Sequence, residues 1–419
     1  MRALVFGMGI TGQAVAHALE AHEVEVVRAD DDPARGDGTP VSLDAVDLLV
    51  PSPGVPEHHE VIVEALRRGI PVVSELDLAT YWDDAQRPVV AITGTDGKTT
   101  VTTMVTEMLV ASGRTALAVG NTDVPFVAAL GEPVDVFVVE ASSFRLRFAD
   151  RFAPHVATWL NLAPDHLDWH GSVESYAAAK ARIFEHQAPD DVAIGNADDP
   201  VVMAALADAP ARHVTFGDGG DHRVHAGALV TPSGEEVVAV RDLPRALPHD
   251  IANALAATVT ALEAGASLDG VRAVLTTFTG LPHRVSFVAE ADGIRWYDDS
   301  KATAPHATAA AVAGFEHVVL IAGGRNKGLD LRALADSADR LRAVVAIGES
   351  AGNVAAAFAS RVPVTEAGSM DEAVAVARRA ARAGDAVLLS PGCASFDWYR
   401  SYAERGDDFV RAVRELVGS

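Results

Sequence analysis

The first part of the chain alternates short apolar runs with stretches that have a helical spacing of apolar residues. The runs "ALVF", "VEVV", "DLLV" and "IPVV" have strand length, and helical stretches such as Gln13 to Ala21 and Glu60 to Arg68 lie between them. Strands that alternate with helices are typical of a parallel sheet built from βαβ units. The charged, proline-containing segment "YWDDAQRP" interrupts this pattern, so we predict a first domain over residues 1–87.

The same alternation starts again at residue 88. The strand "VVAIT" is followed by a glycine-containing loop, a helix from Thr99 to Ser112 that Gly113 ends, and strands near "TALAV", "DVFVVE" and "VATWLNL". Residues 213–243 alternate apolar and polar positions among glycines, which predicts β-hairpins. The helix "DIANALAATVTALEAG" follows, and the Gly and Pro of "TTFTGLPHR" mark a second boundary. We therefore predict a central domain over residues 88–281.

The last part of the chain, residues 282–419, contains the apolar runs "VVLIAGG", "AVVAIG" and "AVLLSPG". Each run ends in small residues, and alanine-rich helical stretches separate them. This is the pattern of a third parallel α/β domain with loops at the strand ends. The predicted fold class is thus α/β in three domains.

Composition and charge narrow the class of protein. Hydrophobic residues make up 49% and charged residues 22% of the 419 residues, and no apolar run approaches the ~20 residues that span a bilayer. The single cysteine, Cys393, cannot form an internal disulfide, and we expect it to be a packed small residue. A net charge of −24 has the wrong sign for a general nucleic-acid binder. We expect a cytoplasmic protein that inserts into no membrane and binds no nucleic acid.

The motif "GMGITG" follows the first predicted strand and precedes a helix. It places Gly7, Gly9 and Gly12 in a G-x-G-x-x-G pattern, with Asp30 at the end of the next strand. This pattern is typical of dinucleotide binding, but glycines before a helix allow backbone N–H groups to approach any nucleotide diphosphate. A tight structural turn is a third interpretation. A second loop, "SPGV" at residues 52–55, would face the same crevice.

The stretch "ITGTDGKTT" at residues 92–100 has the parts of a phosphate loop. A buried strand leads into Gly94 and Gly97, Lys98 supplies a cation, and Thr99 opens a helix and offers a hydroxyl to Mg²⁺. The common phosphate-loop motif has a glycine at position 92, which this chain lacks, and a solvated polar loop is the alternative. Asp96 is unfavourable beside a triphosphate unless its side chain points outward or meets the metal.

Three further residues stand where a nucleotide-binding sheet can use them. Glu140 ends the strand "VFVVE", where it could hold a metal or complement a helix dipole. His166, in "PDHLD", could equally be a surface hydrogen-bonding group. The spacing around Lys180 in "ESYAAAKARIF" predicts an exposed helical lysine.

The chain resembles the Mur ligases, the ATP-dependent amide ligases of peptidoglycan synthesis. The resemblance rests on "GTDGKTT", "VVEASSF" and "NLAPDHLDWHGSVESYAAAKARIFEH", and it extends from "GMGITG" to "SPGCASFDWYRSYAERGDDF". It implies a Rossmann-like N-terminal domain, a central P-loop ATPase-like domain and a Rossmann-like C-terminal domain. Asp96 departs from the family pattern, in which asparagine is usual. The string "WYDDSKATAPHATAAA" at 296–311 is similar to that of the member that adds D-glutamate to UDP-N-acetylmuramoyl-L-alanine.

The resemblance also implies roles for individual residues. ATP and two Mg²⁺ ions are the implied cofactors, and Lys98, Glu140, His166 and Lys180 are the implied catalytic residues. The implied ATP-binding residues are Gly94, Thr95, Asp96, Gly97, Lys98, Thr99, Thr100, Asn253, His283, Arg284, Asp299 and Lys301. The implied metal ligands are Thr99, Glu140, His166 and Lys180, the last as a carbamylated lysine.

The two other substrates have implied sites of their own. Those for the UDP-substrate are Ile10, Thr11, Asp30, Ser52, Gly54, Asn121 and His166. Those for D-glutamate are Thr303, Lys327, Ser395, Phe396 and Tyr402. We expect a monomer.

Other functions remain open from the sequence. Another Mur ligase or a folylpolyglutamate synthase would share most of these motifs. A nicotinamide-dependent oxidoreductase would explain "GMGITG" and Asp30 but would leave the phosphate loop, Glu140 and the third domain unused. A non-enzymatic nucleotide-binding switch is a further hypothesis. In the cluster around Arg284 and Asp299, a simple salt bridge is the alternative to ATP binding.

Overall fold

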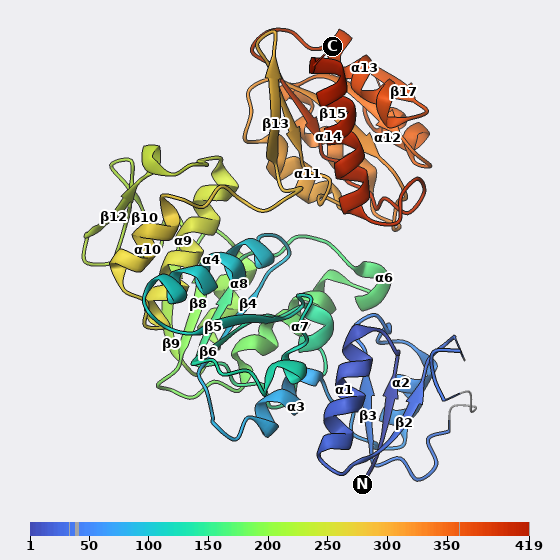
Figure 1. The fold of residues 1–419 in the computed structure, drawn as a ribbon, viewed down its shortest axis with the longest axis vertical. Coiled ribbons are helices and arrows are strands. Elements are labelled where there is room, and N and C mark those ends of the chain that lie inside the picture. The colour runs from blue at the N-terminus through green and yellow to red at the C-terminus, as the bar shows by residue number, and fades with distance from the viewer. Residues whose placement is uncertain (33, 38–41, 360, 419) are drawn as a thin grey trace. The chain divides into compact units, whose positions relative to one another are not determined.

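The structure, a computed structural model, describes residues 1–32, 34–37, 42–359 and 361–418 (Figure 1). The chain forms two compact units. The first comprises Met1–Pro244 with Ile251–Phe278, and the second comprises Arg245–Asp250 with Thr279–Ser419. Both units are α/β, as the alternation of apolar runs and helical stretches predicted. The division into domains at residues 87 and 281 stays a prediction.

The N-terminal part of the first unit is a small parallel sheet flanked by helices. Its strand order is β2-β1-β3, so the first strand lies in the middle. The elements are β1 (Arg2–Phe6), α1 (Ile10–Ala21), β2 (Glu25–Ala29), β3 (Leu48–Pro51), α2 (Glu60–Arg67) and α3 (Glu75–Trp82). The carboxyl ends of β1 and β3 lead into the two predicted glycine loops. The two loops lie at the same edge of the sheet, because parallel strands end at the same edge.

The run "IPVV" was predicted to be a fourth strand, and this prediction is wrong. Val72 forms only an isolated parallel bridge with Leu49. The chain turns away two residues later, where Ser74 caps α3 by accepting a hydrogen bond from the N–H of Leu76. A helix cap so close to the bridge leaves no room for a longer ladder.

The central part of the first unit is a six-stranded parallel sheet with the order β5-β6-β4-β7-β8-β9. Its strands are β4 (Val89–Thr93), β5 (Ala116–Gly120), β6 (Val136–Glu140), β7 (Val156–Trp159), β8 (Val192–Asn196) and β9 (Arg212–Phe216). The helical segments that accompany them are α4 (Lys98–Ala111), η1 (Phe126–Ala129), α5 (Ser143–Leu146), α6 (Leu167–His170), α7 (Val173–Glu185), α8 (Pro200–Ala207), α9 (Pro248–Glu263) and α10 (Leu268–Leu275). The strand β4, which carries the phosphate loop, lies inside the sheet between β6 and β7.

The hairpin prediction for residues 213–243 is confirmed in part. The segments β10 (Arg223–His225), β11 (Ala228–Val230) and β12 (Glu236–Ala239) form an antiparallel sheet, and η2 (Val240–Asp242) follows it. Residues 213–216, however, belong to β9, which pairs in parallel with β8. In β9, His213 is exposed and Thr215 is half-buried on one face, whereas Val214 and Phe216 are buried on the other, so the sequence alternates as in a hairpin strand.

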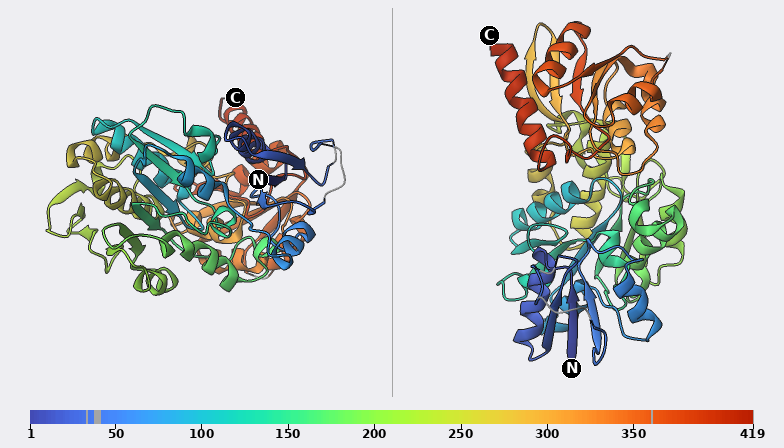
Figure 2. Two further views of the ribbon diagram at one scale, coloured as in Figure 1. Left: turned by 90° about the horizontal axis from the view of Figure 1, so that it is seen from below. Right: turned by 90° about the vertical axis from the view of Figure 1, so that its right-hand side faces the viewer.

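The second unit contains a six-stranded sheet with the order β13-β14-β18-β15-β16-β17. Its strands are β13 (Ser286–Ala291), β14 (Ile294–Asp298), β15 (Val318–Gly323), β16 (Leu341–Ile347), β17 (Val364–Ala367) and β18 (Ala386–Leu389). Its helical segments are α11 (Pro305–Val312), η3 (Leu331–Arg340), α12 (Ala351–Ala357), α13 (Met370–Ala380) and α14 (Tyr402–Gly418). Of the strands described in this sheet, only β13 runs antiparallel, and the long C-terminal helix α14 packs along it (Figure 2).

The N-terminal sheet and the central sheet share one apolar core. Val5 of β1 and Leu48 of β3 belong to the same buried cluster as Leu76 of α3, Phe126 of η1 and Phe137 of β6. A shared core of this kind fixes the two sheets against each other, because opening it would expose apolar surface to water. The predicted substrate loops and the phosphate loop therefore belong to one packed body.

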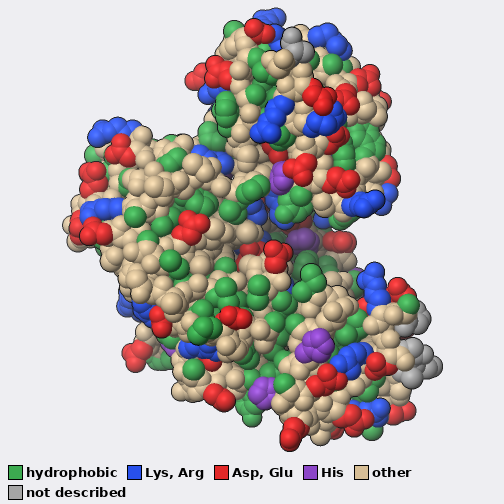
Figure 3. Space-filling view, viewed as in Figure 1, with side chains coloured by type: hydrophobic (Ala, Val, Ile, Leu, Met, Phe, Trp, Pro, Cys, Tyr) green, Lys and Arg blue, Asp and Glu red, His purple; other side chains and the backbone are tan. Residues whose placement is uncertain are grey.

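Two surface properties bear on the kind of partner. Among the described residues, no helix is both long and apolar enough to cross a membrane. Acidic and basic side chains are interspersed on the visible face of each unit, without a continuous basic patch there (Figure 3).

Candidate functional site

The phosphate loop lies at the carboxyl end of β4 and leads directly into α4. Gly97 is the N-cap and has a φ of 85°, a left-handed conformation that favours glycine. Lys98 is the first helical residue, and its Nζ donates to the carbonyl oxygens of Gly94 and Thr95 at 2.8 Å each. The lysine thus curls over the loop, and the first turn of α4 points its N–H groups into the same space.

Asn253, predicted to bind ATP, lies against the phosphate loop. A Cβ atom at Gly97 would clash with the Oδ1 atom of Asn253. Any other residue at position 97 would displace this asparagine. The structure thus brings together a loop residue and a residue of α9 that are far apart in the sequence.

Asp96 is held in the loop by Asn161. Asn161 Oδ1 accepts hydrogen bonds from the N–H groups of Asp96 and Thr95 at 2.9 and 3.0 Å, and its Nδ2 donates to the carbonyl oxygen of Asp96. The side chain of Asp96 is half-buried. The loop conformation is therefore fixed by backbone contacts that do not depend on the side chain at position 96.

Glu140 ends β6 beside the phosphate-loop strand, opposite Ile92 of β4. Its side chain is buried, and Asn121 Nδ2 donates to Oε1 at 2.8 Å. Among the described residues, Oε2 has no hydrogen-bond partner. A buried carboxylate oxygen without a donor is costly unless a cation or a ligand satisfies it. Glu140 therefore fits a metal ligand better than a helix-capping group.

Lys180 is not the exposed helical lysine that its spacing predicted. It projects from α7 with 1% of its surface exposed, and its Nζ donates to the carbonyl oxygen of Gly94 at 2.6 Å. Burial, followed by the nearby cation of Lys98, holds the pKa of Lys180 well below its usual range. The Nζ also lies 4.6 Å from the ring centre of Tyr176. This environment favours the neutral amine form of Lys180 over the charged one.

His166 lies on a loop that the structure brings towards Lys180. It adopts a left-handed conformation with a φ of 52°, immediately before α6. Its ring is 4.7 Å from that of Phe144 and 6.2 Å from that of Tyr176. Tyr176 in turn donates to Thr95 Oγ1 at 3.3 Å. His166 is therefore close to side chains that contact both the phosphate loop and Lys180.

A hollow of about 470 Å³ lies at the glycine loops of the N-terminal sheet. Six of the seven residues predicted to bind the UDP-substrate line it, and His166 does not. The six are Ile10, Thr11, Asp30, Ser52, Gly54 and Asn121. Asp30 accepts hydrogen bonds from the N–H groups of Asp32 and Met8, and these bonds lower the pKa of its carboxyl group.

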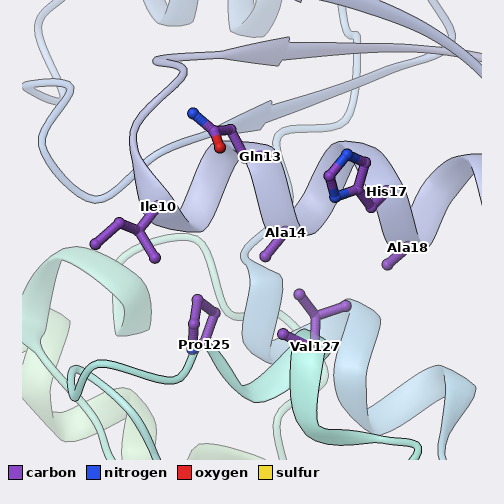
Figure 4. Close-up of a pocket in the computed structure, with 8 residues that line it drawn as sticks. Ile10, Gln13, Ala14, His17, Ala18, Pro125 and Val127 are labelled. Carbon is purple, nitrogen blue, oxygen red and sulfur yellow. The ribbon is translucent and has the colours of Figure 1, made fainter.

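A second hollow of about 560 Å³ lies between α1 and the loop that leads into η1. Ile10, Ala14 and Ala18 line it from the helix, and Pro125 and Val127 line it from the opposite side (Figure 4). Ile10 contributes to both hollows. The N-terminal end of α1 therefore separates the glycine-loop hollow from a more apolar one.

The other predicted ATP-binding residues lie in the second unit. His283 Nδ1 is 2.6 Å from Asp298 Oδ2. Asp299 is buried and accepts hydrogen bonds from Ser390 Oγ and the N–H of Val285. Burial raises the pKa of Asp299 to about 7, although those bonds and the charge of Arg284 oppose the shift.

Four of the five residues predicted to bind D-glutamate lie on three strand-end loops of the second unit, and the fifth, Tyr402, is the first residue of α14. Thr303 follows β14, Lys327 follows β15 and Ser395 follows β18. The loops are hydrogen-bonded to one another, through Gly392 N–H to the carbonyl oxygen of Ala302 and through reciprocal bonds between residues 325 and 394. The structure therefore brings the backbones of these three segments together.

Phe396 and Tyr402, the two aromatic residues predicted to bind D-glutamate, differ in their surroundings. Phe396 is 58% exposed, whereas the ring centre of Tyr402 lies 3.8 Å from Nζ of Lys301.

Arg325, which had no predicted role, forms an ion pair with Glu349 at 2.7 Å. Cys393 is buried, and burial raises the pKa of its thiol to about 11, which confirms the prediction of a packed residue.

Three buried residues with polar groups lie next to the predicted sites but have no predicted role: Tyr176, Arg145 and Arg405. Arg405 donates to Ser300 Oγ and to the carbonyl oxygens of Ser300 and Cys393. A signal existed for it, because position 405 shares a helical face with the apolar residues Phe409 and Ala412. Arg145 lies in a helix of four residues, which is too short to have a detectable period.

Comparison with known protein families gives two matches along the chain. Residues 92–261 match the Mur ligase middle domain, and residues 283–393 match the Mur ligase glutamate ligase domain. The first match contains the phosphate loop, Glu140, His166 and Lys180. The second begins at His283 and ends at Cys393.

Curated relatives match almost the whole chain. A UDP-N-acetylmuramoylalanine--D-glutamate ligase of Frankia casuarinae is 45% identical, with 99% of this chain and 94% of the relative covered. A protein of the same name from Pelotomaculum thermopropionicum is 41% identical, with 99% and 98% covered.

Solved structures share the fold at lower identity. UDP-N-acetylmuramate-alanine ligase MurC from Thermotoga maritima has a TM-score of 0.61 at 19% identity, with 99% of both chains covered. A folylpolyglutamate synthase from Mycobacterium tuberculosis has a TM-score of 0.62 at 19% identity, with 86% of this chain and 98% of that chain covered. Likeness at this level of identity concerns the fold alone. Family matches in two parts of the chain and relatives that align from end to end agree: the chain belongs to the Mur ligase family.

Proposed function

We propose that this chain is an ADP-forming ligase that joins D-glutamate to UDP-N-acetylmuramoyl-L-alanine in peptidoglycan synthesis. The observation that carries the proposal is a phosphate loop flanked by the buried residues Glu140 and Lys180. Relatives named UDP-N-acetylmuramoylalanine--D-glutamate ligase align with the chain from end to end. The division into domains over 1–87, 88–281 and 282–419 is part of the proposal. So are a monomeric state and a cytoplasmic location.

The reaction requires activation of a carboxylate, which is a poor electrophile. In the first step, a carboxylate oxygen of UDP-N-acetylmuramoyl-L-alanine attacks the γ-phosphorus of ATP, the bond to the β-phosphate oxygen breaks, and ADP leaves. In the second step, the amine of D-glutamate attacks the carbonyl carbon of the acyl phosphate, phosphate leaves, and the nitrogen loses a proton. Lys98 would bind the terminal phosphate oxygens, as the cation at the loop.

The predicted metal ligands fit Mg²⁺ in their chemistry. Glu140 offers a buried oxygen with no partner among the described residues, and Thr99, the second residue of α4, offers a hydroxyl group. Mg²⁺ would neutralise phosphate charge in this place. The described ranges contain no cluster of three His, Cys, Asp or Glu side chains that could hold a metal ion. Only two of the four predicted ligands, Glu140 and His166, are of these residue types, so the predicted site would not form such a cluster.

Carbamylation of Lys180 would give the proposed metal site a further carboxylate-like ligand. Only an unprotonated amine can attack CO₂, and burial favours that form of Lys180. The product would be an anion next to Lys98. In the unmodified protein, the positive charge of Lys98 opposes protonation of Lys180. A buried lysine with a lowered pKa is thus suited to the modification, and an exposed lysine is not.

The two remaining substrates would occupy separate sites. The hollow at the glycine loops would hold the UDP-substrate, because backbone N–H groups there can bind a diphosphate. The three loops with Thr303, Lys327 and Ser395 would hold D-glutamate, whose two carboxylates need donors at two separated points. Asn253, His283, Arg284, Asp299 and Lys301 remain the proposed ATP-binding residues outside the phosphate loop.

Phosphate release tests the proposed function directly. The protein is incubated with ATP, Mg²⁺ and UDP-N-acetylmuramoyl-L-alanine, together with D-glutamate, L-glutamate or no amino acid. We expect release that depends on D-glutamate. Equal release without an amino acid, or a preference for L-glutamate or another amino acid, would contradict the assignment.

Glu140→Gln tests the metal site. The substitution keeps the shape and the acceptor for Asn121 but removes the charge. We expect the Mg²⁺ concentration at half-maximal phosphate release to rise by at least roughly tenfold, the scale of changes near metal ligands. Glu132→Gln, an exposed glutamate before the same strand, is the matched control. An Mg²⁺ dependence equal to that of the control would refute the metal role.

A further inference from the structure

The helix α5 carries a buried arginine that the proposed reaction does not use. Arg145 is 5% exposed and lines the hollow at the glycine loops. The helix follows shortly after Glu140, at the end of β6. Arg145 therefore lies between the proposed UDP-substrate site and the proposed metal site.

Each nitrogen of the Arg145 guanidinium group donates to a different element of the first unit. Nε donates to Glu75 Oε1 of α3 at 2.8 Å, Nη1 donates to Asn121 Oδ1 at 2.9 Å, and Nη2 donates to Thr11 Oγ1 at 3.1 Å. Thr11 belongs to "GMGITG", and Asn121 follows β5 directly. One side chain thus joins three segments that are far apart in the sequence.

The contact continues from Asn121 to Glu140. Asn121 Nδ2 donates to Glu140 Oε1, and its backbone N–H donates to the carbonyl oxygen of Glu140, both at 2.8 Å. A chain of direct hydrogen bonds therefore runs from Thr11 through Arg145 and Asn121 to the Glu140 carboxylate. It fixes which oxygen of Glu140 is bonded and leaves Oε2 for a cation.

We propose that Arg145 is a positioning residue that holds the first turn of α1, at Thr11, in register with the Glu140 carboxylate. The inference rests on the proposed function, because it takes Thr11 as part of the UDP-substrate site and Glu140 as a metal ligand. Arginine suits this role, because its rigid fork can donate to three acceptors in fixed directions, whereas lysine has a single nitrogen.

A neighbouring arginine supplies a comparison. Arg147 bonds to Glu57 of the same N-terminal part at 2.6 Å, but its side chain is 38% exposed, and Glu57 is not bonded to Glu140. Both arginines connect α5 to the N-terminal part. Only Arg145 also reaches the metal carboxylate through Asn121, so Arg147→Met is a control for loss of a connecting arginine.

Two variants separate positioning from stability. R145K keeps the charge opposite Glu75 but cannot also reach Thr11 and Asn121. The double variant R145M/E75Q removes both charges of the buried pair, so no charge is left unpaired, and glutamine still accepts from the N–H of Val127, which Glu75 Oε2 now does. Thermal unfolding and circular dichroism establish that each variant is folded.

The test measures binding, so it does not depend on turnover. Calorimetry gives the Kd for UDP-N-acetylmuramoyl-L-alanine. Electron paramagnetic resonance gives the Kd for Mn²⁺, used as a probe for the metal site, in the presence of a non-hydrolysable ATP analogue. We expect both R145K and R145M/E75Q to weaken Mn²⁺ binding roughly tenfold and UDP-substrate binding about fivefold. R147M is expected to change neither Kd by more than about twofold.

Folded R145K and R145M/E75Q with both Kd values unchanged would overturn the proposal, as would weaker UDP-substrate binding with unchanged Mn²⁺ binding. Failure of the proposed function would give a different set of results. A wild-type protein that binds both probes but releases no phosphate with D-glutamate would refute the function, while the variants would still decide the role of Arg145.

Discussion

Lys180→Ala is expected to lose phosphate release by at least about a hundredfold and to recover part of it when short carboxylic acids are added. The substitution removes the buried amine, whose pKa is lowered by burial, and opens space beside Gly94 and Tyr176. Formate, acetate or propionate could enter that space and supply the carboxylate that a carbamylated lysine would provide. The measurement is phosphate release at increasing concentrations of each acid.

Lys180→Met is the matched control for this rescue. Methionine fills the space but carries no carboxylate, so this variant should be as inactive as Lys180→Ala and should not respond to added acids. Mass spectrometry of the wild-type protein at raised bicarbonate concentration would detect the carbamate itself. A folded Lys180→Ala variant that no acid rescues at any concentration would count against the carbamate.

Lys98→Ala is expected to reduce turnover by roughly a thousandfold, because it removes a preorganised cation from the phosphate being transferred. Binding of UDP-N-acetylmuramoyl-L-alanine should remain within about twofold of the wild type. The reason is that Lys98 bonds to the phosphate loop through Gly94 and Thr95, and it does not line the hollow at the glycine loops. Phosphate release and calorimetric titration measure the two effects separately.

Arg114→Ala is a suitable control for Lys98→Ala. Arg114 lies just beyond the other end of α4, so the variant removes a cation near the same helix but far from the loop. It should keep its turnover. If Lys98→Ala lost turnover and UDP-substrate binding together, the lysine would support the fold of the site, and its assignment to the phosphates would be wrong.

Local patterns predicted the parts of the site that lie at strand ends. The phosphate loop and Glu140 follow apolar runs, and parallel strands end at one edge of their sheet, so sequence alone indicated that they lie close together. The burial of Lys180 could not be predicted in this way. Its position on α7 gives an exposed pattern, and only the packing of that helix against the end of β4 encloses the amine.

The Arg145 contacts show the same limit. Glu75, Thr11 and Asn121 lie 70, 134 and 24 positions from Arg145 in the chain, so no local window contains the set. The fold errors have a local cause. The run "IPVV" has the composition of a strand, but the cap at Ser74 ends it, and the alternation in β9 reflects one buried face and one more exposed face.

The apolar core that β1 and β3 share with Phe126 and Phe137 has a consequence for chimeric proteins. Residues 1–87 are not an interchangeable module, because their buried face is completed by side chains of the following sheet. A graft of this segment from another Mur ligase would place a foreign apolar surface on Phe126 and Phe137. Exchange of the UDP-substrate site between relatives should therefore succeed only when the side chains of η1 and β6 that complete this core are exchanged with it.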